Sequence, residues 1–413
     1  MRKISLAVII LLLMLVATAC GNQSEGSKEE IEFLVSGDNV EGNAISTMAK
    51  KYSDENDVTI KVVEVPYADM STRISNMVRD DNPPELVRTT SLSPLWKDSL
   101  MDLSEINKSL DIDENLPIKV DDETKALPLD LTAVGLFVNK DLFEEAGVSF
   151  PTNEEDTWTW DTFVDSVNEV VEKTNARYGF VMDGSEHRLQ SMLYQFGSNG
   201  FVPNDEGGYT TNEETKEGLE YFVDINDNTT MPKSVWTSGE DATAMFKSGR
   251  VAAYMSGSWQ LKDFSENIKD FEWKSVYMPY EETRATNLGG NFTLGFEGTG
   301  NEEETKKFIE WLYQKENYEE LAKLGGYLPV VNDTDIQYDV AQESYELYQN
   351  EIKASPPVSA YMKTEMNGKQ LTAEGNAQNV LKEQVISVLN GDQTIDEALE
   401  ETTATYTEVY GEK

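Results

Sequence analysis

The chain has 413 residues, with 76 acidic and 34 basic side chains, a formal net charge of −42 and one cysteine. This acidity argues against nucleic acid as a partner and against attraction to anionic lipid, because both reward basic surfaces. The single cysteine, Cys20, excludes a disulfide framework and a cysteine-based metal site, and we expect no metal or other cofactor. The length suffices for two domains with their own hydrophobic cores.

The first predicted element is an export signal. Two basic residues precede an apolar run, residues 4–16, which is shorter than the roughly 20 residues of a membrane-spanning helix. Small residues then lead into Cys20, as in a cleavable secretory signal. This pattern resembles the lipobox of bacterial lipoproteins, although Ala17 stands where leucine is usual. The resemblance implies a signal peptide at 1–19, a lipid on Cys20 and an extracellular position on the cell membrane of a Gram-positive bacterium; a plain secreted protein is the alternative.

Polar residues follow the signal, and then a first domain. Residues 20–30 are short of apolar side chains and predict a flexible, lipidated tether. After them, alternating and helical hydrophobic spacings predict, in turn, strand, helix, strand, helix and strand at residues 31–35, 44–52, 58–65, 70–78 and 85–87. This order is typical of a parallel sheet covered by helices.

The second half of the chain repeats the alternation with different residues. Hydrophobic runs predict strands at 136–138, 179–182 and 251–255, and helical spacing predicts helices at 160–171, 306–313 and 380–389. Gly391 ends the last of these helices, and Thr394 with Glu397 has the spacing of a capping box that begins one more. The sequence therefore predicts an α/β protein with two domains.

Several sequence blocks occur in an order that resembles one known family. They are residues 126–129 (ALPL), 136–143 (LFVNKDLF), 145–161, 238–259 and 323–330 (KLGGYLPV). Together they resemble the extracellular solute-binding proteins of bacterial ABC importers, in the carbohydrate-binding branch that includes maltose-binding protein. The resemblance covers essentially the whole mature chain. It implies the type II fold of periplasmic binding proteins, in which two α/β lobes close on a hinge around a ligand.

The resemblance also implies where the lobes divide. Chain crossovers are expected near residues 130–134, 278–281 and 327–331. The N-terminal lobe would comprise 31–132 plus 281–327, and the C-terminal lobe 133–280 plus 328–413. We expect a monomer that binds a carbohydrate and meets the permease subunits of an ABC transporter.

A sugar site needs flat aromatic surfaces and side chains that exchange hydrogen bonds with hydroxyl groups. Trp259 follows the predicted strand 251–255 where the family carries a sugar-stacking aromatic, and a core tryptophan is the alternative. The other ligand contacts that the resemblance implies follow predicted strands or lie at crossovers: Asp38, Asn39, Thr89, Asp130, Thr132, Glu186, Arg188, Gly290 and Asn291.

At several of these positions a purely structural role is the alternative. Asp38 has the character of a helix cap, and Gly290 that of a simple turn. His187, the only histidine, is more often structural than ligand-binding. Tyr361 and Trp158 are weaker candidates for the site.

Two other functions compete with solute import. An exported hydrolase or lyase of polysaccharides would use paired carboxylates, but no nucleophile elbow or zinc-protease motif is present, and no catalytic residue is predicted. A binding lipoprotein associated with a sensor would share this sequence and differ only in its partner.

Overall fold

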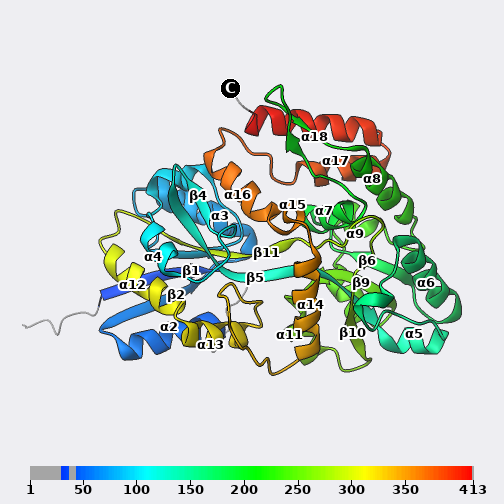
Figure 1. Ribbon diagram of the computed structural model, residues 1–413, viewed down its shortest axis with the longest axis horizontal. Coiled ribbons are helices and arrows are strands. Elements are labelled where there is room, and N and C mark those ends of the chain that lie inside the picture. The colour runs from blue at the N-terminus through cyan, green and yellow to red at the C-terminus, as the bar shows by residue number, and fades with distance from the viewer. Residues whose placement is uncertain (1–28, 37–42, 412–413) are drawn as a thin grey trace, which may run out of the picture.

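The computed structural model describes residues 29–36 and 43–411 and shows two α/β lobes side by side (Figure 1). The expected signal peptide 1–19, Cys20 and nearly all of the expected tether lie outside the described residues. Within the described ranges, no helix combines the length and the apolarity needed to cross a membrane.

The N-terminal lobe is built on a mixed sheet. Strand β1 pairs in parallel with β2 and β3, while β3 pairs antiparallel with β11. The expected parallel arrangement of the strands at 31–35, 58–65 and 85–87 is confirmed, and β11 adds an antiparallel strand to it. Its strands are β1 Glu29–Val35, β2 Val58–Glu64, β3 Leu86–Thr89 and β4 Ile118–Val120. Its helices are α2 Ala44–Glu55, η1 Tyr67–Asp69, α3 Met70–Arg79, η2 Pro94–Ser99, α4 Ser104–Ser109, α12 Glu302–Leu312 and α13 Lys315–Gly325.

The C-terminal lobe has β9 at its centre, paired in parallel with β6 and antiparallel with β5. Its strands are β6 Tyr178–Met182, β7 Val202–Pro203, β8 Tyr209–Thr210, β9 Val251–Gly257 and β10 Trp273–Val276. Its helices are α5 Lys140–Ala146, η3 Glu154–Asp156, α6 Trp160–Lys173, α7 Glu186–Gln195, α8 Glu213–Ile225, α9 Ser234–Thr237, α10 Ala242–Lys247 and α11 Gln260–Asn267. The strands at 179–182 and 251–255 and the helix at 160–171 are thereby confirmed.

Two long strands connect the lobes. β5 (Glu123–Asn139) pairs with β4 at its start and with β9 and β10 at its end, and β11 (Leu288–Gly295) pairs with β5 across the junction. The expected strand at 136–138 is thus only the end of a 17-residue strand. Gly135 fits inside this strand because the ring of Tyr348 fills the space, and a Cβ there would lie 2.0 Å from that ring.

The third connection returns to the C-terminal lobe and leads to the last helices. Leu328 pairs with Leu131 of β5, so the connections lie side by side. The helices that follow are α14 Gln342–Ala354, α15 Pro357–Ala360, α16 Met362–Thr372, α17 Val380–Asn390 and α18 Ile395–Tyr410. Within the segment 328–413, α16 packs on η2 and β4 of the N-terminal lobe, and its Leu371 lies in that core. Gly391 ends α17 with a left-handed φ of 80°, and the capping box at the start of α18 is confirmed.

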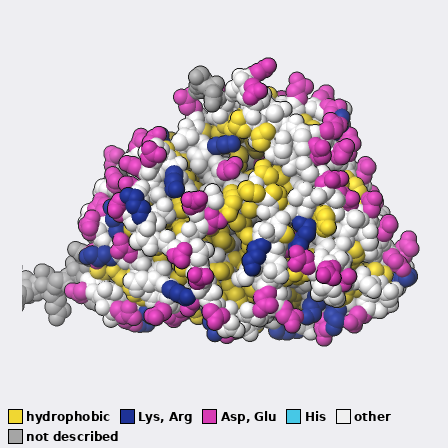
Figure 2. Space-filling view, viewed as in Figure 1, with side chains coloured by type: hydrophobic (Ala, Val, Ile, Leu, Met, Phe, Trp, Pro, Cys, Tyr) yellow, Lys and Arg dark blue, Asp and Glu magenta, His cyan; other side chains and the backbone are white. Residues whose placement is uncertain are grey.

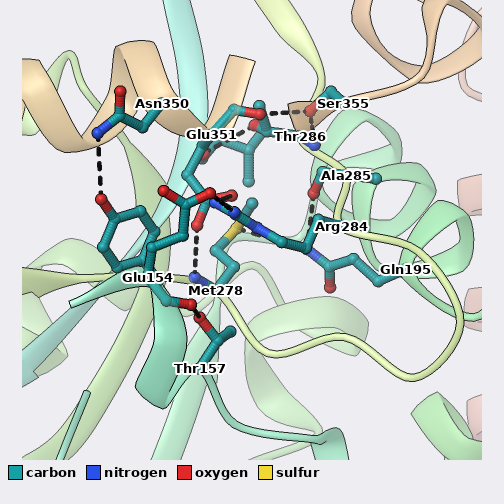
Figure 3. Close-up of polar contacts among 12 residues, drawn as sticks. Glu154, Thr157, Gln195, Met278, Arg284, Ala285, Thr286, Asn350, Glu351 and Ser355 are labelled. Atoms are coloured by element: carbon teal, nitrogen blue, oxygen red, sulfur yellow. Dashed lines mark hydrogen bonds and ion pairs between the residues drawn. The ribbon is translucent and has the colours of Figure 1, made fainter. Parts of the chain in front are cut away.

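A buried ionic cluster ties the loop before β11 to α14 (Figure 3). Glu351 of α14, 1% exposed, accepts hydrogen bonds from Met278 N at 2.9 Å and Arg284 Nη2 at 3.2 Å. Arg284 also pairs with Glu154. Burial raises the pKa of Glu351, and the Arg284 charge opposes that shift. Because α14 packs on β10 and β5, this loop stays on the C-terminal lobe, and the chain crosses within β11, after residues 278–281.

Candidate functional site

A cavity of about 630 Å³ lies between the lobes, lined by the connecting strands, by both lobes and by α16, α17 and α18. This volume is typical of small-molecule sites. Figure 2 shows acidic side chains spread over both lobes, with hydrophobic side chains gathered in the region between them. The predicted site residues that line the cavity are Asp130, Thr132, Glu186, Arg188, Trp259, Gly290 and Asn291.

In the cavity wall formed by the N-terminal lobe, the polar side chains are hydrogen-bonded to one another. Arg88 of β3 donates through Nε and Nη2 to Asp130 Oδ2 of β5, at 3.0 and 2.8 Å, and through Nη1 to Ser36 O at 3.0 Å. Asn291 donates to Asp130 Oδ1 through its backbone N at 3.1 Å and its Nδ2 at 3.0 Å. The Tyr327 ring centroid lies 5.2 Å from the Arg88 guanidinium carbon. Both charges are buried and both Asp130 oxygens are partnered, so this wall is fixed and neutral.

Trp259 lies in the opposite wall, just after β9, and is partly buried. The Arg188 guanidinium lies over the ring, 4.4 Å from its centroid, and is held by Asp183 Oδ2 at 3.0 Å and Ser185 Oγ at 2.9 Å. Gly257 is required beneath the ring, because a Cβ there would come within 2.0 Å of it. The wall therefore presents the indole together with a guanidinium rather than a bare aromatic platform.

A tight backbone approach joins β11 to β5 at the bottom of the cavity. Gly290 has a φ of 130°, and a Cβ there would lie 2.0 Å from Asp130 O, so only glycine fits. Beside it, a Cβ on Gly289 would lie 2.8 Å from Thr132 Oγ1 and 3.3 Å from His187 Nε2. Both ring nitrogens of His187 are buried and have no hydrogen-bond partner. Burial and nearby cations lower the pKa of His187 well below its usual value, so its ring is neutral.

Glu186 is already engaged by the protein. Its Oε1 accepts from Gln190 Nε2 at 3.1 Å and Tyr406 Oη at 3.2 Å, and its Oε2 accepts from Lys382 N at 3.4 Å, in the first turn of α17. Burial raises the pKa of Glu186 to about 7. The carboxylate thus joins α7 to α17 and α18 within the C-terminal lobe.

Other predicted residues lie elsewhere. Thr89 is buried and donates to Ser91 O at 3.2 Å, while its neighbour Thr90 lines the cavity. Trp158 belongs to the C-terminal core, and Tyr361 donates to Asp113 Oδ2. Asp38 and Asn39 lie outside the described residues.

Sequence reasoning missed several residues that line the cavity: Tyr67, Arg88, Tyr327, Lys363, Tyr406 and Tyr410. Arg88 directly follows the strand predicted at 85–87, and this position could have indicated it. The last three come from α16 and α18, whose helical spacing gave no indication that they reach across to the cavity. Within the described ranges, no group of three or more His, Cys, Asp or Glu side chains could hold a metal ion.

Residues 47–344 match the family model described as bacterial extracellular solute-binding protein. The chain belongs to this family. The match confirms the resemblance seen in the sequence, and neighbours among solved structures confirm the two-lobed α/β fold. A solute-binding protein from Thermotoga lettingae, solved with α-D-tagatose, has a TM-score of 0.72 at 18% identity and covers 93% of this chain and 100% of its own. A substrate-binding protein from Listeria monocytogenes, solved with cycloalternan, has a TM-score of 0.71 at 20% identity, with 92% and 98% covered.

Among curated relatives, the arabinooligosaccharide-binding protein of Halalkalibacterium halodurans is 28% identical over 256 residues, which are 59% of this chain and 55% of that protein. The chain spans about half the length of the first curated relatives it matches.

Proposed function

We propose that the protein captures a sugar or oligosaccharide in the cavity between its lobes and closes on it by hinge motion. The cavity carries the side chains that such a ligand requires. The rings of Trp259, Tyr327, Tyr406 and Tyr410 can cover apolar sugar faces, and Thr132, Asn367 and Gln378 can exchange hydrogen bonds with hydroxyl groups. Relatives that bind arabinooligosaccharides support a carbohydrate as the ligand.

The observation that carries this proposal is the joint construction of the cavity. Arg88 and Asp130 come from one lobe and Arg188 and Trp259 from the other, and β5, β11 and the segment around Leu328 run between the lobes. A ligand that contacts both walls gains contacts when the lobes close, which is the energetic basis of hinge closure.

A thermal-shift screen tests the ligand class. A bound sugar raises the melting temperature because it binds the native state alone, by about 2.7 kcal/mol of stability at 100 times its Kd. We expect one or a few related sugars from a mono- and oligosaccharide library to raise it. A flat response to every sugar, with a response to amino acids or peptides in the same assay, would contradict the proposal.

We also propose that the protein is a monomer anchored by lipid on Cys20, and that it delivers its ligand to the permease of an ABC transporter. Labelling of cells with an alkyne-tagged fatty acid tests the anchor. The wild type should be labelled and sediment with membranes, and Cys20→Ala should be unlabelled and released to the medium. Equal release of both would contradict the anchor.

We further propose that the protein binds sugar without cleaving it. Arg88, Asp130 and Glu186 are committed to contacts within the protein, so no carboxylate pair is poised for acid–base chemistry in the described cavity. Incubation with a glycan that the protein binds should give no new reducing ends. Turnover above the background of a heat-inactivated sample would contradict this.

A further inference from the structure

We propose that the captured sugar is acidic and that its carboxylate pairs with Lys363. This inference rests on the proposed carbohydrate function and narrows it to uronic acids and oligosaccharides that contain them. The observation behind it is an ammonium group that lines the cavity and forms no hydrogen bond or ion pair with any described residue, in a chain of net charge −42.

Lys363 is the second residue of α16 and lines the cavity with part of its surface exposed. Among the described residues it forms no hydrogen bond and no ion pair. Such isolation is costly, because a partly desolvated charge is stable only near an opposite charge. Desolvation accordingly lowers the pKa of Lys363, and the charge of Glu186 opposes this shift.

The other charges around the cavity balance one another. Arg88 pairs with Asp130 at 2.8 Å, and Arg188 pairs with Asp183 at 3.0 Å. Asp183 accepts further hydrogen bonds from Tyr254 Oη at 2.6 Å and Ser256 Oγ at 3.1 Å, so it is fully occupied. Of the charged residues around the cavity, Lys363 and Glu186 remain outside these pairs.

Glu186 does not serve as the counter-ion of Lys363. Its hydrogen bonds go to Gln190, Tyr406 and the first turn of α17, and none goes to Lys363. The donors to Glu186 are all neutral groups of the C-terminal lobe. Glu186 acts on Lys363 through charge attraction alone, so the ammonium has no directly bonded partner among the described residues and can take a ligand carboxylate.

The surroundings of Lys363 add to this preference. Helices α7 and α16 both begin at the cavity, with His187 and Arg188 in the first turn of one and Met362 and Lys363 in the first turn of the other. The dipoles of both helices favour negative charge at these N-terminal ends. Arg188 Nε is also buried without a hydrogen-bond partner.

The chemistry fits a sugar carboxylate better than a phosphate. Arg88 is bound to Asp130 and Ser36, and the two terminal nitrogens of Arg188 are bound to Asp183 and Ser185. The cavity therefore offers the compact Lys363 ammonium and the single Arg188 Nε rather than a free guanidinium fork, which suits a single negative charge better than a phosphate. The rings of Tyr406 and Tyr410 line the same cavity and offer apolar surface for the pyranose that carries the carboxylate.

Calorimetry with paired sugars tests the inference. Each pair differs by carboxylates alone: digalacturonate against α-1,4-galactobiose, and glucuronosyl-xylotriose against glucosyl-xylotriose. Galactose 6-phosphate against galactose supplies the phosphate arm. The wild type, Lys363→Met and the matched control Lys353→Met, which removes an exposed lysine from α14, are titrated with each sugar.

We expect at least one acidic sugar to bind tenfold or more tightly than its neutral partner in the wild type and in Lys353→Met. Lys363→Met should abolish that preference and leave the neutral sugar within about threefold of its wild-type affinity. An unchanged melting temperature of Lys363→Met shows that the variant is folded.

Three results overturn the inference, and they are distinguishable. Neutral sugars that bind as tightly as acidic ones, or a Lys363→Met variant that keeps the preference, leave the carbohydrate function standing without the acidic sugar. Preference for the phosphate arm alone replaces the carboxylate with a phosphate. Failure of every sugar to bind removes the carbohydrate function together with the inference.

Discussion

The two walls of the cavity differ in how their buried charged and polar groups are partnered. In the N-terminal wall, Arg88, Asp130 and Asn291 satisfy one another, and the charges are almost completely buried. In the opposite wall, the ring nitrogens of His187 have no hydrogen-bond partner among the described residues, Lys363 forms no ion pair with them, and burial raises the pKa of Glu186 to about 7. The first arrangement stabilises the fold, and the second leaves interaction capacity for a ligand. Substitutions in the first wall should therefore cost stability, and those in the second should cost affinity.

The largest expected effect is the loss of the buried pair in the N-terminal wall. Arg88→Met leaves Asp130 buried without its cation, and breaking a pair of this kind costs about 3–5 kcal/mol of unfolding free energy. Urea denaturation measures this cost. Arg73→Met, at an exposed position on α3, should stay within about 0.5 kcal/mol of the wild type. Equal unfolding free energies of Arg88→Met and Arg73→Met would contradict the claim that the Arg88–Asp130 pair in the N-terminal wall stabilises the fold.

The second effect is a pH dependence in the C-terminal wall. The raised pKa of Glu186 means that its ionisation is harder in the native than in the unfolded state. Its destabilising contribution is absent at low pH, grows as pH rises above about 4.5 and levels off above about 7. Glu186→Gln should therefore gain about 2 kcal/mol of stability relative to the wild type between pH 5 and pH 8.

The measurement for Glu186 is a series of urea titrations across that pH range. Glu401→Gln, at an exposed site on α18, serves as the control and should differ from the wild type by the same amount at each pH. If the difference in unfolding free energy between Glu186→Gln and the wild type were also independent of pH, the destabilising ionisation of Glu186 would be contradicted.

The third effect concerns affinity alone. Trp259→Ala removes the indole that lies beneath Arg188 in the C-terminal wall, and we expect sugar binding to weaken at least about tenfold, or 1.4 kcal/mol. Sugar should also shift the tryptophan fluorescence of the wild type. Trp311→Ala, in the N-terminal lobe away from the cavity, controls for loss of a tryptophan. Unchanged affinity in Trp259→Ala would place the ligand elsewhere.

The contrast between the walls also marks what the sequence could predict. Trp259 and Arg188 follow regular strands and helices, so local pattern and family resemblance brought them to the cavity. Lys363, Tyr406 and Tyr410 lie on helices whose spacing predicts only an inward face, and tertiary packing decides that they line the cavity. The sequence therefore indicated where the site lies but not its charge.

The strands also differ in how well the sequence predicts them. Strands β1, β2, β6 and β9 were predicted because each is a continuous or alternating apolar run. The 17-residue β5 was not, because Pro128, Asp130 and Gly135 interrupt its pattern. Two of these residues are accommodated by distant partners: Asp130 by Arg88, and Gly135 by Tyr348. Such long-range compensation leaves no local signal.

The central claim is that a ligand is held between two lobes that close on it. Small-angle X-ray scattering of the protein, alone and saturated with the tightest sugar found by thermal shift, tests it most directly. The account predicts a smaller radius of gyration in the complex, with the Lys353→Met control behaving as the wild type. An unchanged radius of gyration at full saturation would contradict closure around a ligand in this cavity.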